Sequence, residues 1–453
     1  MLPQGLITSL ENVSGFNKQA FEEVHQKTDI ITSIRRNSEK LTDTVFENSS
    51  PVAWCSLGEY LVERPSFVFD PLWHAGAYYV QEASSMFLWH ICKTLFKNDT
   101  KKLVLDLCAA PGGKSTLLSN YFKDGLIVSN EVIKSRAAIL QENITKWGSN
   151  NVVITNNDAE HFKTLNSIFD AVFVDAPCSG SGLFRKDKEA ILEWSENNVQ
   201  LCNQRQKRIL GNIINVLKPN GYLIYSTCSY SQEENEEIAD WLMDNFDVES
   251  VSINIEMDWG IIETQSLKHA ANGYRFYPYL TKGEGFFVTV FKKKSGFTDV
   301  NKLPKNKKIV VATKQEISIA ELYVQQPSLF NFVKHQLDII AIPIHWHNTI
   351  ELLAHHLYLK KIGTTIGQLK QHDIIPAHDL AVSTIKASNF IKIEINKETA
   401  IKYLQKKDVQ LETNTTGWAI VNYCEVSLGF VKVLPNRINN YYPKEWRILK
   451  DYF

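Results

Sequence analysis

The sequence predicts an α/β protein whose largest domain is a doubly wound parallel sheet. Between residues 102 and 291, short apolar runs rich in β-branched and aromatic residues alternate with stretches of helical periodicity. The chain has 453 residues, of which 44% are hydrophobic and 22% charged, enough for two to four well-packed domains. Strands that alternate with helices form a parallel sheet, and such sheets bind ligands at the carboxyl ends of their strands. Functional residues are therefore expected at those ends.

Six short runs are predicted to be strands of this sheet: 103–107, 126–131, 152–155, 171–175, 222–226 and 285–291. Helices are predicted between them by apolar residues that recur every three or four positions. One such face is formed by Ile133, Ala137, Leu140, Ile144 and Trp147, and a second by Ile209, Ile213, Ile214 and Leu217. Gly148 and the Pro–Asn–Gly at 219–221 are expected to end these two helices.

Five segments are expected along the chain. They are a small α+β module at 1–72, the doubly wound domain at 73–294, a basic linker at 295–309, an intermediate domain at 310–384 and a C-terminal domain at 385–453. Residues 386–453 carry eleven Lys or Arg against seven Asp or Glu, whereas the whole chain has a formal net charge of -1. Any attraction for nucleic acid is therefore expected to be local.

The cysteines indicate a reducing compartment. The chain has seven of them and no CxxC pair, which argues against a disulfide framework or a zinc ribbon. The start lacks a basic and then apolar leader, and no apolar run is long enough to span a membrane, so we expect a cytoplasmic protein. Four cysteines are interpreted as small buried hydrophobes: Cys55, Cys92, Cys202 and Cys424. No metal site is expected, since His345, His347, His355 and His356 lack acidic or cysteine partners at fixed spacing.

The stretch LVLDLCAAPGGKS predicts a strand, a glycine turn and a helix. GGKS resembles a phosphate loop, but Cys108 stands where that loop requires glycine, and no GxGxxG occurs. The turn still allows a ligand to approach backbone N–H groups at the start of a helix. Glu131, at the end of the next strand, suits a ribose diol, and Asp158, after the third, suits an adenine amino group.

Each of these acids alone is more often a surface or capping residue. Their occurrence at successive strand ends favours an adenosine-type ligand instead. S-Adenosylmethionine fits best, because its sulfonium cation tolerates nearby carboxylates that would repel a phosphate.

Cys178 and Cys228 each follow an apolar run at a predicted strand end. A thiolate is a strong nucleophile for a soft, conjugated carbon. Carbon 6 of a pyrimidine accepts a thiolate while the neighbouring carbon 5 accepts a methyl group, so the sequence predicts cytosine methylation. One thiol attacks and the other, with Asp175, holds the base or assists release. Lys114 is expected to neutralise charge that develops on the cytosine carbonyl oxygen.

The motifs DLCAAPGGKS, DAPCSGSGLFRKD and YSTCSYSQEENE resemble those of the NOL/NOP/Sun-type RNA cytosine-5 methyltransferases. YYVQEASSM at 78–86 and GEGFF at 283–287 also fit. The resemblance implies a seven-stranded sheet with one antiparallel strand near its edge. It further implies that Cys228 is the covalent nucleophile and that Cys178 assists product release. The residues implied to bind S-adenosylmethionine are Cys108, Ala109, Ala110, Pro111, Gly112, Gly113, Lys114, Glu131, Asp158 and Asp175.

The C-terminal run resembles the PUA-like module of RsmF-type bacterial rRNA methyltransferases. The first seventy residues, with TSIRRN at 32–37, weakly resemble the family's N-terminal RRM-like module. The expected substrate is therefore 16S rRNA or the small ribosomal subunit, bound by a monomer. Basic residues near Tyr442 and Trp446 suit phosphates and unstacked bases. The predicted RNA contacts are Arg437, Tyr441, Lys444 and Arg447. Trp418 and Phe430 are expected to fill the core.

Other functions share some of these features. A tRNA cytosine-5 methyltransferase would carry the same motifs, and a non-catalytic RNA-binding assembly factor would keep the cofactor pocket. A DNA cytosine methyltransferase would use the thiol of the PC motif and lack that of the TC motif. The acidic run at 231–237 is predicted to start a helix, where acids favour the positive end of the dipole, and is assigned no catalytic role.

Overall fold

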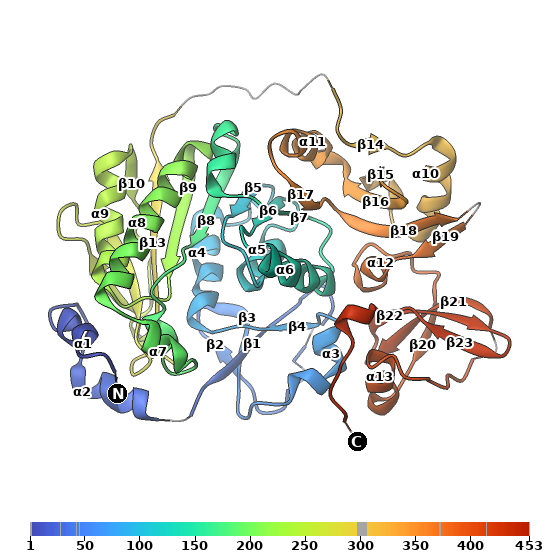
Figure 1. The fold of residues 1–453 in the computed structure, drawn as a ribbon, viewed down its shortest axis with the longest axis horizontal. Coiled ribbons are helices and arrows are strands. Elements are labelled where there is room, and N and C mark those ends of the chain that lie inside the picture. The colour runs from blue at the N-terminus through green and yellow to red at the C-terminus, as the bar shows by residue number, and fades with distance from the viewer. Residues whose placement is uncertain are drawn as a thin grey trace.

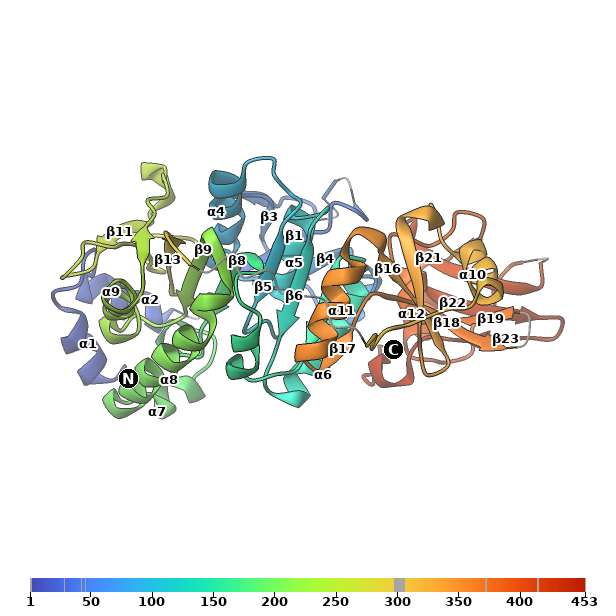
Figure 2. The same cartoon turned by 90° about the horizontal axis from the view of Figure 1, so that it is seen from above.

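The computed structural model describes residues 2–27, 29–41, 43–44, 46–296, 306–370, 373–413 and 415–452. Most of the predicted linker, 297–305, lies outside these residues. The described chain forms four sheets (Figure 1). Figures 1 and 2 both show an elongated molecule, with α1 and α2 at one end and β19–β23 at the other. None of the described helices has the length and apolarity that crossing a membrane requires.

The N-terminal sheet is antiparallel, with strand order β2-β3-β1-β4. Its strands are β1 (Thr32–Arg36), β2 (Ser50–Val52), β3 (Cys55–Leu61) and β4 (Tyr78–Val80), with α3 (Pro71–His74) before β4. Strand β4 lies beyond residue 72, where the module was expected to end. Helices α1 (Gln4–Leu10) and α2 (Lys18–Gln26) instead pack against Phe184, Tyr230 and Tyr277 of the main domain.

Parallel strands form the centre of the main sheet, in the order β9-β8-β5-β6-β7. They are β5 (Leu103–Asp106), β6 (Leu126–Asn130), β7 (Val152–Thr155), β8 (Phe169–Asp175) and β9 (Leu217–Thr227). Strand β13 (Phe286–Lys293) runs antiparallel beside β9. All six predicted strands are present, and the antiparallel strand implied by the family resemblance is confirmed.

Helices cover both faces of this sheet, as a doubly wound fold requires. Helices α4 (Phe87–Phe96), α5 (Gly113–Tyr121) and α6 (Lys134–Trp147) pack on one face, and α8 (Glu196–Ile213) and α9 (Glu236–Asn245) on the other. Helix α6 ends at Gly148, whose φ of 83° is left-handed, as the sequence predicted. Helix α8 ends at Ile213, before the Pro–Asn–Gly, which lies within β9. A short helix, α7 (Glu189–Glu193), precedes α8.

The main sheet has ten strands in the described residues, so it includes and extends beyond the seven-stranded core that the resemblance implied. Strands β10 (Val248–Ser250), β11 (Ile262–Gln265) and β12 (Asn272–Phe276) extend it beside β13. At the opposite edge, β17 (Leu359–Lys361) of the intermediate segment pairs antiparallel with β7. A sheet edge exposes unpaired backbone groups, and β17 covers those of β7. The intermediate segment is therefore joined to the main domain through the sheet.

The C-terminal half contains two further sheets. The first is formed by β14 (Val310–Val311), β15 (Phe330–His335), β16 (Asp338–Pro343), β18 (Thr364–Lys370) and β19 (Asp373–Pro376), with helices α10 (Lys314–Ala320), α11 (His347–His356) and α12 (His378–Val382). The second is formed by β20 (Ile391–Glu394), β21 (Gly417–Tyr423), β22 (Val426–Leu434) and β23 (Arg437–Asn440), with α13 (Lys397–Leu404).

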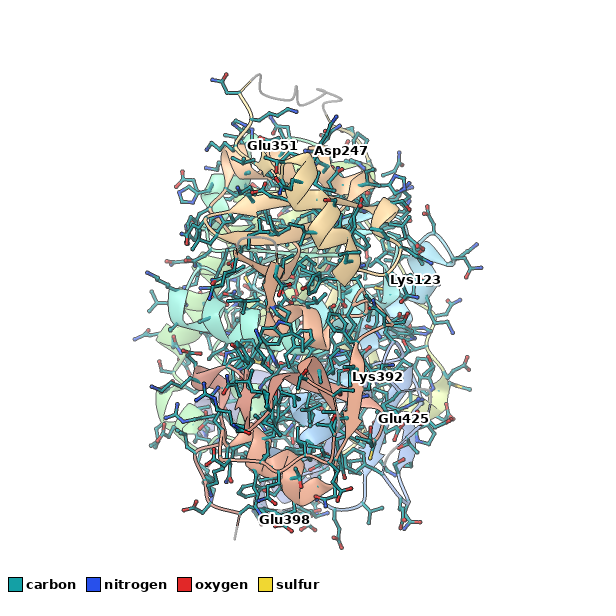
Figure 3. All side chains as sticks on the ribbon, turned by 90° about the vertical axis from the view of Figure 1, so that its right-hand side faces the viewer. Lys123, Asp247, Glu351, Lys392, Glu398 and Glu425 are labelled. Carbon is teal, nitrogen blue, oxygen red and sulfur yellow. The ribbon has the colours of Figure 1, made fainter. Side chains whose placement is uncertain are left out.

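One core joins the N-terminal sheet to the last sheet. Leu72 and Tyr78 of the N-terminal segment belong to the same buried cluster as Leu404 and Tyr442. Exposed charges of both signs lie around the last sheet, and Figure 3 labels Lys392 of β20, Glu398 of α13 and Glu425 in the turn between β21 and β22. The N-terminal and C-terminal segments are therefore held together by apolar packing, although more than 300 residues separate them in the sequence.

Candidate active site

The glycine turn lies at the carboxyl end of β5 and leads into α5. Together with residues 79–82, Ser85 and Asp175 it lines a pocket of about 190 Å³. Gly112 has a φ of 118°, a conformation that side chains other than glycine rarely adopt. A Cβ on Gly113 would lie 3.2 Å from the Tyr79 ring. Gly112 therefore allows the tight turn, and Gly113 leaves room beside Tyr79 for a ligand against the backbone.

Lys114 and Asp175 meet across this pocket. Lys114 Nζ lies 2.7 Å from Asp175 Oδ2, and Ser226 of β9 donates to Asp175 Oδ1 at 2.8 Å. Burial lowers the pKa of Lys114, but the charge and hydrogen bond of Asp175 outweigh it and raise the pKa above its ordinary value. Lys114 is therefore a permanent cation at the strand ends. Together these contacts connect α5, β8 and β9.

Further acids surround the turn. Asp106, at the end of β5, accepts from the Ser115 hydroxyl at 2.6 Å, while its other oxygen is buried and has no hydrogen-bond partner among the described residues. Burial raises the pKa of Asp106 to about 7. Glu131 accepts from the Ile133 N–H at 2.9 Å and lies 3.7 Å from Arg136.

Arg136 also donates to the carbonyl of Ala110 at 2.8 Å and so connects Glu131 to the glycine turn. Buried acids beside a glycine-lined pocket fit a cationic, adenosine-type cofactor such as S-adenosylmethionine.

Asp158 is placed differently from the other predicted cofactor residues. It does not line the pocket at the glycine turn. Its carboxylate accepts from the Glu160 N–H at 2.9 Å and pairs with Arg208 at 3.2 Å. These contacts lower the pKa of Asp158, with the backbone hydrogen bond contributing most. In this structure Asp158 therefore caps a short helix.

The two predicted thiols lie together. The Sγ atoms of Cys178, after β8, and Cys228, after β9, are 3.0 Å apart, and all cysteines in the described residues are free thiols. The hydrogen bond to Cys228, followed by burial, raises the pKa of Cys178 well above its ordinary value. Cys178 therefore keeps its proton and can donate a hydrogen bond to Cys228. Because the strand ends are adjacent in the sheet, residues 50 positions apart form one site.

Glu234 connects the loops that carry these thiols, a role that the sequence did not reveal. Its carboxylate accepts from the Ser179 N–H at 2.9 Å and from the Ser179 and Ser229 hydroxyls at 2.5 Å each. Gln206 of α8 donates a fourth hydrogen bond at 3.0 Å. The acidic run was predicted only to start a helix, and α9 does begin at Glu236. Glu234 itself is fully buried and fixes Ser179 and Ser229, the neighbours of both cysteines.

The residues that form a second wall of the pocket were also not predicted to be site residues. It comes from the end of the N-terminal sheet: Tyr79, Val80, Gln81, Glu82 and Ser85. Glu82 accepts from the Glu284 N–H at 2.8 Å, and Arg185 lies 3.3 Å from the Glu284 carboxylate. These contacts join the YYVQEASSM, GEGFF and FRKD stretches. Their presence among the family motifs was the signal that could have indicated this wall.

The predicted RNA contacts lie in β23, the edge strand of the last sheet, and in the segment that follows it. Arg437, Tyr441 and Lys444 are exposed, and Arg447 is half-buried and donates to the Lys444 carbonyl at 2.7 Å. Tyr442, interpreted as part of the same surface, is instead buried against His378 and Tyr403. Its ring fills the core shared with the N-terminal segment.

Two further predictions concern cysteines and core aromatics. Phe430 is buried as expected, but Cys424 is exposed, which corrects its interpretation as a buried hydrophobe. Cys424 sits in the tight turn between β21 and β22 with a φ of 47°. The turn points it outward, whereas Cys55, Cys92 and Cys202 are buried.

The strand order and the glycine turn at the first parallel strand place this chain in the class of S-adenosylmethionine-dependent methyltransferases. Residues 93–292 match the family model of 16S rRNA methyltransferase RsmB/F, residues 2–83 match the N-terminal domain of 16S rRNA methyltransferase RsmF, and residues 390–448 match the methyltransferase RsmF PUA domain. The chain belongs to the RsmB/F family of 16S rRNA methyltransferases, in its RsmF branch, and is an S-adenosylmethionine-dependent rRNA cytosine-5 methyltransferase.

Individual relatives agree with this family. The ribosomal RNA small subunit methyltransferase F of Psychromonas ingrahamii is 30% identical over 413 residues, covering 87% of this chain and 84% of the relative. That of Shewanella piezotolerans is 29% identical over 443 residues, covering 92% and 91%. These matches favour 16S rRNA over the alternative tRNA substrate.

Solved structures resemble the fold. A methyltransferase homologue from Pyrococcus horikoshii matches with a TM-score of 0.51 and 29% identity, over 64% of this chain and 100% of the other. NSun6 from Pyrococcus horikoshii, solved with SFG, matches with a TM-score of 0.53 over 65% of this chain and 98% of the other. Its identity is 17%, so it supports the fold alone.

Proposed function

We propose that Cys228 is the nucleophile of this methyltransferase and that Cys178 assists the release of the product. The observation that carries the proposal is the contact of 3.0 Å between their sulfur atoms at adjacent strand ends. Cys178 keeps its proton because its pKa is raised. It can therefore donate a hydrogen bond that stabilises a thiolate at Cys228.

The proposed reaction proceeds through a covalent adduct between Cys228 and the target cytosine. The Cys228 thiolate forms a bond to carbon 6 of cytosine, and the electron pair moves to carbon 5. S-Adenosylmethionine, when bound, would supply the methyl group that carbon 5 accepts and would leave as S-adenosylhomocysteine. A base then removes the carbon 5 proton, the double bond re-forms and the bond between carbon 6 and Cys228 breaks. Lys114 and Asp175 are positioned to hold the polar edge of the base while this occurs.

The glycine turn and Glu131 are proposed to hold the cofactor. The turn, residues 108–114, presents backbone groups to the pocket, and Glu131 ends the next strand with a buried carboxylate. Asp158 would have to leave Arg208 to reach an adenine, so we propose that cofactor binding replaces this contact. Exchange of one partner for another costs little when the ion pair is partly exposed, as this one is.

The substrate is proposed to be 16S rRNA within the small ribosomal subunit, bound by a cytoplasmic monomer. Arg437, Tyr441, Lys444 and Arg447 are proposed to contact the RNA outside the active site, because exposed cations beside an aromatic ring suit phosphates and bases. We also propose that the N-terminal module ends at Val80, the last residue of its sheet, and that the main domain starts at Gln81. The other domain bounds are proposed to be those expected from the sequence.

A covalent trap tests the assignment of the thiols. 16S rRNA transcribed with 5-fluorocytidine cannot lose the group at carbon 5, so the enzyme should remain attached to it. The adduct should form with the wild type and with Cys178→Ala but not with Cys228→Ala, as measured by denaturing gels and by mass analysis of the linked peptide. Exposed Cys424 provides a control, because Cys424→Ala should form the adduct normally. An adduct that survives Cys228→Ala but not Cys178→Ala would overturn the assignment.

A further inference from the structure

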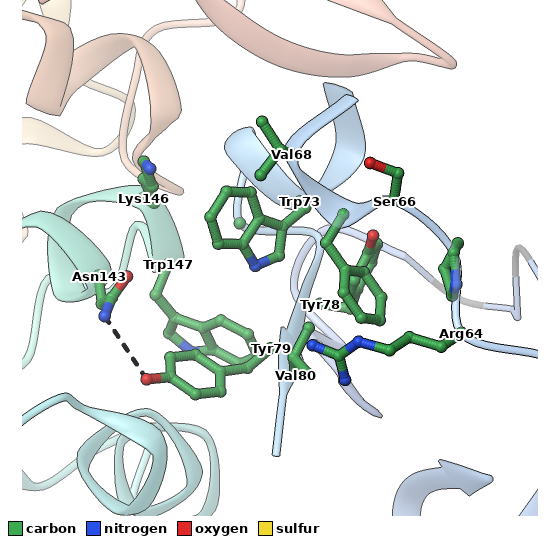
Figure 4. Close-up of a pocket in the computed structure, with 13 residues that line it drawn as sticks. Arg64, Ser66, Val68, Trp73, Tyr78, Tyr79, Val80, Asn143, Lys146 and Trp147 are labelled. Atoms are coloured by element: carbon green, nitrogen blue, oxygen red, sulfur yellow. Dashed lines mark hydrogen bonds between the residues drawn. The ribbon is translucent and has the colours of Figure 1, made fainter. Parts of the chain in front are cut away.

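We propose that a second pocket, outside the active site, binds one unpaired nucleotide of the rRNA next to the target cytosine. We call it the aromatic pocket. Its volume is about 430 Å³, a size that accommodates a nucleotide. Three segments line it: residues 64–68 after β3, residues 73–80 around α3 and β4, and residues 143–147 at the end of α6 (Figure 4). The proposal rests on the assigned rRNA methyltransferase activity.

The walls of the aromatic pocket suit a base. Trp73 and Tyr79 are half-buried, so each presents part of its ring to the pocket. Trp147 is buried and held in place by Arg35, whose guanidinium carbon lies 4.6 Å from the centre of its ring, and by a hydrogen bond to Asn120. Aromatic rings that are fixed before binding favour the stacking of an unpaired base.

The charge of the aromatic pocket suits a phosphate. Arg64 is exposed and points into the pocket from its rim (Figure 4), and Lys146 lies on the opposite wall. Lys146 is paired with Glu142 at 2.6 Å and lies 4.9 Å from the centre of the Trp73 ring. None of the described residues that line the pocket is acidic. Arg64 is therefore the cation available to a phosphate.

The aromatic pocket adjoins the active site. Tyr79 and Val80 line both it and the pocket at the glycine turn. Asn143 donates to the Pro111 carbonyl at 2.8 Å and lies 3.5 Å from the Tyr79 hydroxyl, a contact that Figure 4 shows. An enzyme that modifies a base must take it out of the stack, and this also unstacks its neighbours. The aromatic pocket is placed to receive such a neighbour when the cytosine reaches Cys228.

Steady-state methylation tests this proposal. The substrate is small ribosomal subunits from a strain that lacks the gene, with labelled S-adenosylmethionine. Arg64→Glu should raise the KM for subunits by about 10-fold, because it repels a phosphate, and change kcat less than 2-fold. The control is Lys123→Glu, which reverses an exposed charge at the amino end of β6, away from the strand ends that carry the site. Its KM should equal that of the wild type.

A second pair of variants separates stacking from packing. Trp73→Ala should raise the KM by about 10-fold or more, whereas Trp73→Phe keeps a ring and should raise it less. Thermal unfolding checks that each variant is folded. The proposal is overturned if Arg64→Glu and Trp73→Ala, both folded, leave the KM unchanged.

Cross-linking identifies the occupant. In the trapped 5-fluorocytidine complex, ultraviolet light should attach an rRNA nucleotide to a peptide from residues 64–80. Cross-links from the rRNA to other peptides, with none to residues 64–80, would contradict the proposal. If no wild-type adduct forms, the assignment of Cys228 fails, but the effect of Arg64→Glu on KM still tests the aromatic pocket separately.

Discussion

The strand ends that carry Cys178 and Cys228 differ from the aromatic pocket in how their side chains are held. At the strand ends, Glu234 accepts four hydrogen bonds, and Lys114, Asp175 and Ser226 form a connected chain. In the aromatic pocket, Arg64 is exposed and Trp73 is half-buried. The first region is fixed by paired polar groups and the second is open at its rim.

This difference follows from what each region does. Bond formation at carbon 6 requires atoms held within fractions of an ångström, so polar networks around the thiols keep one geometry. RNA binding tolerates adjustment, because stacking and phosphate contacts vary gradually with position. Substitutions at the strand ends should therefore lower kcat, and substitutions in the RNA-facing regions should raise KM.

The largest effect is expected at the thiols. Cys228→Ala should lower kcat by about 1000-fold or more, because the covalent route is lost. Cys178→Ala should lower multiple-turnover kcat by about 100-fold, yet still allow the attack, so that an adduct with unmodified rRNA accumulates. Single-turnover and multiple-turnover methylation measure the two steps. Equal loss of both steps in Cys178→Ala would contradict its role in release.

A smaller effect is expected at Glu234. Glu234→Ala leaves Ser179 and Ser229 without their shared acceptor and should lower kcat by about 100-fold through misplacement of the thiols. Glu234→Gln keeps an acceptor and should lose about 10-fold. Exposed Glu237 provides the control, as Glu237→Ala should retain full activity. A rise in KM with normal kcat would assign Glu234 to RNA binding. It would also contradict the expectation that substitutions at the strand ends lower kcat.

The free energy of unfolding should depend on pH through Asp106, which lies at the end of β5. Its folded-state pKa is raised from 3.8 to about 7 by burial, so the protonated form favours folding. The stabilising contribution is complete below pH 4 and is lost as the pH rises to about 7. Asp106→Asn mimics the protonated form, so its melting temperature should fall less than that of the wild type between pH 5 and pH 8. If the melting temperatures of the two proteins changed equally with pH, titration of Asp106 would be excluded as the cause.

The smallest effect is expected at the C-terminal face. Arg437→Glu and Lys444→Glu reverse exposed charges and should each raise the KM for subunits by about 2-fold to 5-fold, without a change in kcat. The effect should decrease as salt is added, because these contacts are screened. Kinetics at two salt concentrations measure it. If the effect on KM did not depend on salt, we would conclude that this face does not contact the RNA.

Several features were predictable because they depend on contiguous residues. The glycine turn, the PC motif and the TC motif each lie at the end of a predicted strand, and parallel strands bring such ends together. The contact between Cys178 and Cys228 and the one between Lys114 and Asp175 follow from this rule. The features that were missed have no such local signal. Glu234 occurs in an acidic run typical of a helix start, and only its burial distinguishes it from Glu233 and Glu237.

The sequence by itself determined the doubly wound sheet, the cofactor turn and the pair of thiols, because strand periodicity and glycine-containing turns are local properties of the chain. Only the tertiary structure decided that β17 extends the sheet, that Tyr442 is buried and that the aromatic pocket exists. Each of these features joins segments that are far apart in the sequence. Their contacts depend on which sheet edges and apolar faces remain to be covered once the local elements have formed.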